Sequence, residues 1–510
     1  MKIYKVLLGL FAGVMALNGG VANAQFYEIG PANIGGQVSS LVLDNQDGST
    51  LYAGATSGGL FLRTTNSDVL NNLYSDLGNT VPVEEIVADT TSWHKVTLKL
   101  NNEEVTLPIS SMVQLPNGDL VLGTGDDAYI LGSMYTGRMS SKGRGIYRYT
   151  PSTKTLSLIN FTSNLTNFGA VRALDYIYRD GVLYFFAATN TGVFRWTVTD
   201  ANPEAGWSAN AVPVQTGNVD QMVLSRTLNI GYFSIGPKLY KISNLMAANP
   251  TAFDISASNS AFSAPNTSLK LALAPSNNQY LYVMVINEDG ESENVYLTTN
   301  GQAWTTLTSE TIRPIVGGYN TGKACGTITV DPSNERRIII AGTNIWIGQG
   351  YIEGANYQWT KSSYSEYELN RGDYMGSVFI SSAFVHSGIQ QILPVYSSTP
   401  VYQSSTETLY HTYYIATDGG VYSTRNDFRS FSNINMGMNN VQIANIAVCP
   451  DGSVISGAAF NGCPFIGSRT EHDGGSPVIS WYDYGTMGNF NHSANVLWQG
   501  SGNKVAASAF

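Results

Sequence analysis

Short apolar and aromatic stretches, each ended by a turn of small or polar residues, recur along most of the chain. In its clearest form the unit is an apolar strand, a turn of small residues, and a second strand that carries Tyr, Phe or Trp. The clearest copies are residues 51–66 (LYAGATSGGLFLRTTN), 183–198 (LYFFAATNTGVFRWTV) and 413–428 (YYIATDGGVYSTRNDF). Short runs of β-branched and aromatic residues bounded by turn residues predict β-strands.

The repeat extends to a set of eight copies. Five looser copies begin at residues 120, 230, 280, 338 and 453. Another short strand, closed by a turn of Asp, Pro, Gly or Asn, precedes most copies, as in residues 38–49, 109–119, 171–181, 326–334 and 443–453. With a polar fourth segment, each unit holds four antiparallel strands in about 45–65 residues, which is typical of a propeller blade.

A lone four-stranded sheet leaves both of its faces exposed, whereas radial stacking of several sheets buries those faces and closes a ring. Glycine pairs at the same place in several units, as in residues 57–59 (SGG) and 418–420 (DGG), agree with this arrangement. Two-residue hairpin turns need positive φ angles, which glycine adopts without a steric penalty. The sequence therefore predicts an all-β fold, a single β-propeller of seven or eight four-stranded antiparallel blades.

Residues 1–24 have the features of a secretory signal peptide. Two lysines near the start precede an apolar run at residues 6–17, and residues 22–24 (ANA) supply a small-residue cleavage pattern. We expect this segment to be removed and residues 25–510 to form the propeller domain. A buried N-terminal helix is the alternative interpretation.

An exported chain is expected at the cell surface, in association with the outer membrane, or in the medium; the periplasm is the alternative destination. Position 25 is Gln and not Cys, so a lipid anchor is not expected. No later stretch holds about 18 uninterrupted apolar residues, so no transmembrane segment is predicted. The final residues, 496–510, have the pattern of two strands, which either close the ring against residues 25–29 or precede further chain. No C-terminal sorting domain is visible.

The composition narrows the classes of partner. Charged residues make up 13% of the chain, against about 25% in an average soluble domain. The net charge of −10 without a basic block argues against nucleic acid as a partner. A protein or a glycan at the cell envelope is therefore the expected partner.

Three cysteines allow at most one disulfide. Cys449 and Cys463 are the candidate pair, because they are near in sequence and each is followed by Pro; buried free thiols are the alternative. The wide spacing of Cys325 from this pair argues against a zinc site. The five histidines are dispersed as well, so no metal and no cofactor is predicted.

Two phrases carry a resemblance to a known group of proteins. Residues 29–66 (IGPANIGGQVSSLVLDNQDGSTLYAGATSGGLFLRTTN) form the first, and residues 123–126 (GTGD) followed by 143–147 (GRGIY) form the second. They resemble secreted β-propellers with bacterial-neuraminidase-type repeats, or Asp-boxes. That group includes sortilin-like ectodomains, xyloglucanase-type glycosidases and surface proteins of Bacteroidetes. Gln37 stands where the family usually has Arg.

The best Asp-box copy is residues 298–304 (TTNGQAW). In such hairpins the Asn or Asp side chain holds its own turn by backbone hydrogen bonds, while the Trp packs between blades. The resemblance implies that these boxes lie on the outer rim and have a structural role.

The resemblance also raises the alternative of a glycoside hydrolase. A xyloglucanase-type enzyme needs two carboxylates across the sugar, about 5 Å apart if retaining or about 6.5–9.5 Å if inverting. Asp126, Asp127, Asp418 and Asp473 lie in glycine-rich loops and are the catalytic candidates. Ordinary turn chemistry also explains an Asp beside Gly. A sialidase is disfavoured, because no set of three arginines can be identified.

An aromatic run at residues 348–374 is the best candidate for a recognition surface. Tyr and Trp offer rigid contact area at little entropic cost, and they stack on sugar faces or fill protein pockets. A long loop packed on itself is the alternative. The candidate binding residues are Tyr351, Tyr357, Trp359, Tyr364, Tyr367 and Tyr374.

Three functions remain open from the sequence. The first is an exported, noncatalytic propeller that binds a protein or a glycan. The second is a docking module within a secretion or adhesion assembly. The third is the glycoside hydrolase named above.

Overall fold

A computed structural model describes most of the chain between residues 35 and 448. Contacts divide the chain into two units, Met1–Gly30 and Pro31–Phe510, and the described residues belong to the second. The described ranges are 35–75, 92–125, 142–160, 170–308, 325–350, 357–365, 382–395 and 411–448, with short strands at 401–403, 406–408, 454–458, 464–466, 482–483, 495–498 and 505–508. The predicted signal peptide at residues 1–24 lies outside them and stays a prediction.

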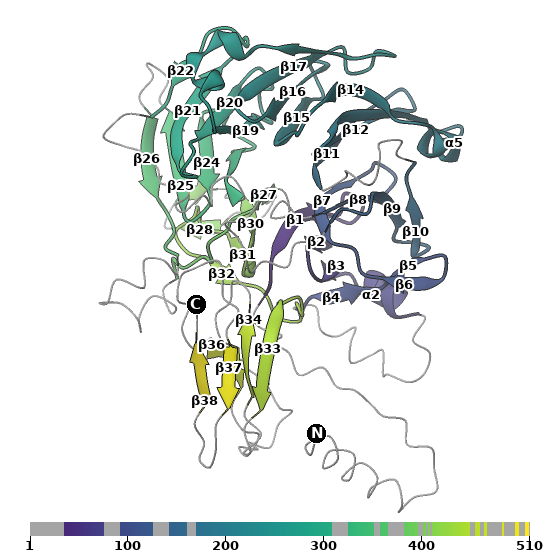
Figure 1. The fold of residues 1–510 in the computed structure, drawn as a ribbon, viewed down its shortest axis with the longest axis vertical. Helices are drawn as coiled ribbons and strands as arrows, with labels where there is room; N and C mark the ends of the chain where they lie inside the picture. The colour runs from purple at the N-terminus through teal and green to yellow at the C-terminus, as the bar shows by residue number, and fades with distance from the viewer. Residues whose placement is uncertain are drawn as a thin grey trace, which may run out of the picture. The chain divides into compact units, whose positions relative to one another are not determined.

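Seven four-stranded antiparallel sheets of the described residues form the blades of a β-propeller (Figure 1). Within each blade the strands follow chain order from the inner to the outer edge. Blade 1 holds β1 (Val38–Leu43), β2 (Leu51–Ala55), β3 (Gly59–Arg63) and β4 (His94–Val96), and blade 2 holds β7 (Ile109–Gln114), β8 (Leu120–Thr124), β9 (Ile146–Thr150) and β10 (Thr155–Leu158). Blade 3 holds β11 (Val171–Arg179), β12 (Val182–Thr189), β13 (Gly192–Thr199) and β14 (Val212–Thr216).

Blade 4 holds β15 (Gln221–Ser225), β16 (Ile230–Ile235), β17 (Lys238–Ser243) and β18 (Thr251–Asp254), and blade 5 holds β19 (Ser268–Leu273), β20 (Leu281–Ile286), β21 (Ser292–Thr298) and β22 (Thr305–Thr306). Blade 6 holds β23 (Thr327–Val330), β24 (Arg337–Ala341), β25 (Ile345–Gly350) and β26 (Tyr357–Lys361), and blade 7 holds β27 (Gln391–Val395), β30 (Thr412–Thr417), β31 (Gly420–Thr424) and β32 (Ser432–Asn433). The predicted all-β propeller is thus confirmed, with seven blades.

Short elements are inserted between these strands. They are the helices α2 (Ser67–Tyr74) and α5 (Pro203–Ser208), the 3₁₀ turns η3 (Ser256–Ser258) and η4 (Ser260–Ser263), and the hairpins β5 (Leu98–Leu100) with β6 (Glu103–Val105) and β28 (Val401–Gln403) with β29 (Thr406–Thr408). The turn that begins with Thr298 has the geometry expected from its sequence. The Asn300 Oδ1 accepts hydrogen bonds from the backbone N–H groups of Gln302 and Ala303, at 2.8 and 2.9 Å. Trp304 packs edge-on against Phe262.

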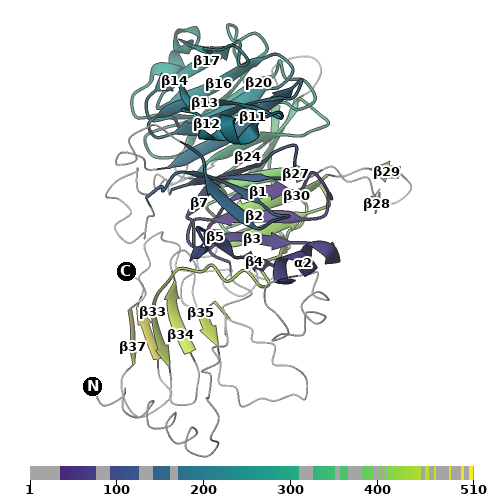
Figure 2. The same ribbon diagram turned by 90° about the vertical axis from the view of Figure 1, so that its right-hand side faces the viewer.

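The innermost strands contact one another in the order β1, β7, β11, β15, β19, β23 and β27, and β27 contacts β1. The buried apolar side chains accordingly divide into seven clusters, each between two neighbouring blades. Strand β12 lies between β11 and β13 in blade 3 (Figure 2), and Phe185 and Phe186 show why it is apolar on both faces. Because successive side chains of a strand point to opposite faces, Phe185 packs toward blade 2 and Phe186 toward blade 4.

The eighth copy of the repeat lies outside this ring. It forms a further four-stranded sheet of β33 (Ile443–Val448), β34 (Val454–Ala458), β35 (Pro464–Ile466) and β36 (Tyr482–Asp483), and the hairpin of β37 (Asn495–Trp498) with β38 (Val505–Ser508) contacts β33 and β34. Because β1 and β27 close the ring, the alternative in which residues 496–510 close it does not hold.

Blades 7 and 1 meet without sharing a strand, so side chains hold the seam between them. The backbone N–H of Gly36 donates to Asn440 Oδ1 at 2.7 Å, and Asn440 Nδ2 donates to the carbonyl of Gln37 at 3.4 Å. The N–H of Leu41 donates to Gln391 Oε1 at 2.7 Å. Trp93, only 3% exposed, donates from its indole N–H to the carbonyl of Ile434. These bonds join residues about 340 to 400 positions apart.

Asn440→Ala is expected to weaken the seam. The substitution leaves the buried N–H of Gly36 without its acceptor, which typically costs about 1–3 kcal/mol of unfolding free energy. Chemical denaturation followed by tryptophan fluorescence measures the change. Asn71→Ala, at an exposed position of α2, is the matched control and should leave stability unchanged or slightly raised. Equal stability of the Asn440→Ala variant and the parent chain would contradict the assigned role of the seam.

Candidate functional site

A cavity of about 110 Å³ lies at the end of the channel where the innermost strands begin. Every blade contributes to its lining. One lining residue from each blade, in order, is Ser39, Ser110, Arg172, Asp220, Lys270, Thr327 and Gln390. The wall is therefore polar, although the blades themselves are packed by apolar side chains.

Bulges in the innermost strands of blades 1, 2 and 3 place one extra residue toward the cavity. These residues are Ser39, Ser110 and Arg172. The hydroxyl of Ser39 donates to the carbonyl of Ile109 in blade 2 at 2.6 Å, and that of Ser110 donates to the carbonyl of Val171 in blade 3 at 2.7 Å. The two serines thus satisfy exposed backbone acceptors of the neighbouring strand and fix its position.

Arg172 occupies the bulge position in blade 3, so a charged side chain stands there where blades 1 and 2 have serine. Its Nη1 lies 3.3 Å from Oδ1 of Asp220 in blade 4, and its Nη2 lies 3.5 Å from Asn218 Oδ1. Asp220 Oδ2 in turn accepts the backbone N–H of Gly236 at 2.7 Å. The side chain of Arg172 is 6% exposed and that of Asp220 is 15% exposed. This ion pair joins blades 3 and 4 at the cavity wall.

A second repeated position in the innermost strands lies directly before an apolar core residue. At this position Ser40 Oγ accepts the N–H of Met112 at 3.0 Å, and Gln221 Oε1 accepts the N–H of Leu271. Gln391 Oε1 accepts the N–H of Leu41 in the same way. In three blades, therefore, the residue here accepts a backbone N–H from the next blade.

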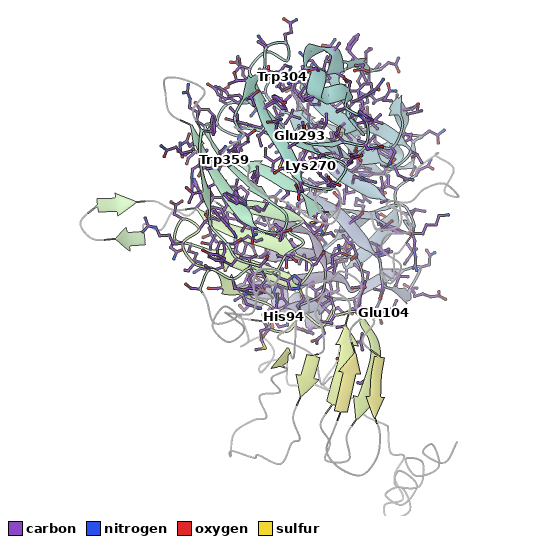
Figure 3. All side chains as sticks on the ribbon, turned by 60° about the vertical axis from the view of Figure 1, so that its left-hand side comes forward. His94, Glu104, Lys270, Glu293, Trp304 and Trp359 are labelled. Carbon is purple, nitrogen blue, oxygen red and sulfur yellow. The ribbon has the colours of Figure 1, made fainter. Side chains whose placement is uncertain are left out.

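Lys270 occupies this position in blade 5, since it precedes Leu271 as Ser40 precedes Leu41 (Figure 3). An ammonium group has three donors and no acceptor, so it cannot make the bond that the serine and the two glutamines make. The residue is 8% exposed and lines the cavity. Blade 5 thus carries a buried lysine where blades 1, 4 and 7 carry a neutral acceptor.

A larger groove of about 660 Å³ lies between blades 2 and 3. Arg148 forms an ion pair with Glu204 and lies 3.8 Å from Asp119. The Tyr178 hydroxyl donates to Asp200 Oδ2 at 2.5 Å, and this hydrogen bond raises the pKa of Tyr178. Tyr178 is 44% exposed, so the groove holds an accessible aromatic ring beside carboxylates.

Of the carboxylates proposed from sequence, the structure describes Asp418. It is 2% exposed in the turn after β30 and accepts from Gln390 Nε2 at 3.0 Å. Asp126, Asp127 and Asp473 lie outside the described residues, although Gly125, directly before Asp126, lines the cavity. As catalytic residues, all four stay predictions.

The predicted disulfide between Cys449 and Cys463 also lies outside the described residues. Cys325 is a buried cysteine outside any disulfide, 3% exposed, and it lines the cavity. Its place there depends on which blades become neighbours in the closed ring.

Three of the six aromatic candidates are described. Tyr357 and Trp359 lie in β26, where the Tyr357 hydroxyl is 3.0 Å from that of Tyr282 and Trp359 Nε1 donates to the carbonyl of Leu307 at 2.9 Å. Both pack against the apolar cluster between blades 5 and 6, and burial raises the pKa of Tyr357. Tyr364 is 50% exposed, with Lys361 Nζ 4.8 Å from its ring centre.

The other three aromatic candidates, Tyr351, Tyr367 and Tyr374, lie outside the described residues. The recognition surface therefore stays a prediction, and Tyr364 is its accessible described member.

The sequence analysis missed Arg172, Asp220 and Lys270. A usable signal was present for two of them, because Arg172 stands in the apolar start of β11 (VRAL) and Lys270 interrupts the apolar strand SLKLAL. Charged residues are rarely buried unless they are paired. A charge within an apolar strand therefore marks a candidate site.

None of the helices among the described residues is long and apolar enough to cross a membrane. No group of three or more His, Cys, Asp or Glu side chains in the same part of the chain is placed to hold a metal ion.

Comparisons with known proteins yield structural similarities alone. No family model matches the chain, and no curated protein matches it. Hydrazine synthase of Kuenenia stuttgartiensis aligns over 80% of this chain and 100% of its own, at 10% identity and a TM-score of 0.42. The extracellular domain of a protein assigned to a one-component system of B. thetaiotaomicron aligns over 86% of this chain, at 13% identity and a TM-score of 0.35.

This chain covers 52% of the length of the second structure. At these identities and TM-scores, neither similarity carries an argument about ligand or reaction.

The positions of Trp359 and Tyr364 predict different consequences of substitution. Trp359→Ala removes an indole that packs between blades and is expected to cost about 3 kcal/mol of unfolding free energy. Tyr364→Ala, at an exposed ring, is expected to change it by less than about 0.5 kcal/mol. Guanidinium denaturation measures both. A large loss of stability in the Tyr364→Ala variant would mean that this ring is structural and not part of a recognition surface.

Proposed function

We propose that this protein is an exported, noncatalytic β-propeller that binds a protein or a glycan at the cell envelope, as a docking module of a secretion or adhesion assembly. One observation carries the proposal: polar side chains from all seven blades converge on one cavity at the end of the channel. The blades are fixed by apolar clusters on both faces, so the converging groups are held in place before a ligand arrives. Preorganisation of this kind lowers the entropic cost of binding.

The charges at the cavity support binding over hydrolysis. Among the described residues that line it, Asp220 is the single carboxylate, and it is held by Arg172 and by the N–H of Gly236. A glycoside hydrolase of the usual kind needs two carboxylates, one of which exchanges a proton. The lining residues instead offer hydroxyls, amides and two cations, which suit recognition.

Affinity capture tests the docking function. The mature chain, residues 25–510, is immobilised and presented with solubilised envelope and with a panel of glycans. We expect one partner to be retained reproducibly, and to be retained less by Arg172→Ser. That substitution places at the bulge the residue that Ser39 and Ser110 supply in blades 1 and 2. It also removes the ion pair with Asp220, so a thermal melt must show that the variant is folded before retention is compared.

Lys95→Gln, at an exposed position of β4, is the matched control and should bind as the parent does. Failure to retain any partner, or equal retention by Arg172→Ser, would argue against docking through the channel face.

The groove between blades 2 and 3 favours hydrolysis of a glycan as the second candidate function. Asp119, Asp200 and Glu204 line it, and the exposed ring of Tyr178 offers a surface on which a sugar could stack. Incubation with β-glucans and sialosides, followed by a reducing-end assay, tests this candidate. Turnover that disappears in Asp200→Asn would establish an enzyme and displace the docking proposal, whereas no turnover is expected if the proposal is right.

A further inference from the structure

We propose that the groove between blades 2 and 3 binds an arginine side chain of a protein partner. The inference goes beyond the proposed function, because the described residues that line the groove differ from those that line the channel cavity. It depends on three observations: the size and apolar floor of the groove, the charges of its wall, and an exposed aromatic ring held beside a carboxylate.

The first observation is that the groove has the size and the lining of a binding site. Its volume of about 660 Å³ falls within the roughly 300–1,000 Å³ of ligand pockets. Buried side chains of the apolar cluster between the two blades form part of its lining, namely Leu115, Leu183, Val198 and Trp207. Such a floor suits arginine, whose methylene groups pack on apolar surface while the charged head stays in a polar environment.

Helix α5 contributes one wall of the groove and is fixed in its place. A Cβ at Gly206 would lie 2.7 Å from the Cα of Val198, so glycine allows the helix to lie directly on β13. Asn160, which follows β10 of blade 2, donates from its Nδ2 to the carbonyl of Ser208 at 2.8 Å. The wall is thus tied to both blades, and a preformed groove lowers the entropic cost of binding.

The second observation is the charge of the wall. The described lining residues include three carboxylates, Asp119, Asp200 and Glu204, and one cation, Arg148. Arg148 forms an ion pair with Glu204 and lies 3.8 Å from Asp119. One cation against three carboxylates leaves two net negative charges. The groove therefore attracts a cationic group and repels an acidic one.

The third observation is an aromatic ring that is exposed and oriented. Tyr178 is 44% exposed, and its hydroxyl donates to Asp200 Oδ2 at 2.5 Å. A cation over the face of an aromatic ring is attracted by the electrons of that ring. The planar guanidinium of arginine stacks on such a ring and also presents its N–H groups to a carboxylate, which the compact ammonium of lysine does less well.

The same arrangement holds an arginine of the chain itself two residues earlier in β11. The guanidinium carbon of Arg226 lies 4.8 Å from the centre of the Tyr176 ring, and its Nη2 lies 3.1 Å from Oδ1 of Asp175. A tyrosine and a carboxylate of blade 3 thus bind a guanidinium there. Tyr178 and Asp200 repeat the pair in the groove, and among the described residues no arginine or lysine stacks on Tyr178.

Fluorescence anisotropy with labelled peptides tests the inference. One peptide carries a single arginine among glycines and serines, and a second carries citrulline, which has the shape of arginine without its charge. We expect the arginine peptide to bind saturably and the citrulline peptide to bind about tenfold more weakly or worse. A lysine peptide should bind less tightly than the arginine peptide. Raising the salt concentration should weaken binding, since the attraction is electrostatic.

Variants of the two paired residues locate the binding. Asp200→Asn keeps an acceptor for the Tyr178 hydroxyl but removes the charge, whereas Tyr178→Leu keeps an apolar side chain but removes the ring. Each should lower the affinity for the arginine peptide by about fivefold or more. Tyr178→Phe retains the ring and should bind more tightly than Tyr178→Leu. Both positions are exposed, so a thermal melt should show folded variants.

Asp289→Asn is the matched control, because it removes one exposed carboxylate from a turn of blade 5. It should leave the affinity for the arginine peptide unchanged.

Three results would overturn the inference. They are equal binding of the arginine and citrulline peptides, equal affinity of the parent and both groove variants, and displacement of the arginine peptide by cellohexaose, which would assign the groove to a glycan. Arg172→Ser lies outside the groove and should not alter peptide binding. If docking at the channel fails, the arginine site therefore stands, and if peptide binding fails, docking at the channel stands.

Discussion

The seam between blades 7 and 1 is the contact on which the rest of the structure depends. A single blade cannot bury its own faces, so the ring is stable only when every blade has two neighbours. Six of the seven seams join blades adjacent in the chain, but the last joins residues as far apart as Gly36 and Asn440. Closing so long a loop costs entropy that local contacts do not repay. The buried Trp93 and the bonds of Asn440 and Gln391 offset that cost together with the apolar cluster of the seam.

Ring closure also creates the candidate site. Among the described residues, the buried apolar side chains lie between blades, and the lining of the cavity is mostly polar. Several of the polar residues in this wall bond backbone groups of the innermost strand of the next blade. The repeat places the same few positions of each blade next to the axis. A substitution at one of these positions therefore changes the chemistry of the channel without changing the fold. Arg172 and Lys270 are charged residues at such positions, and both line the cavity.

Local patterns predicted the elements well and the assembly less well. The apolar run around Phe185 and Phe186 predicted a strand, and the structure buries both of its faces between blades. The turn at Asn300 has the geometry that its sequence implies. The number of blades remained open because the copy that begins at residue 453 has the same strand pattern as the others. That pattern describes a sheet, and it contains no information on which sheets become neighbours.

The sequence by itself determined the class of fold, because glycine turns and short apolar runs act over a few residues and need no distant partner. It also marked out a set of aromatic and acidic residues, but composition could not separate Tyr357 and Trp359, which pack between blades, from the exposed Tyr364. Only the tertiary structure decided that seven sheets close the ring and that Arg172, Asp220 and Lys270 face one cavity. Those residues are about 50 positions or more apart along the chain, and they meet because radial packing brings one strand of every blade to a common axis.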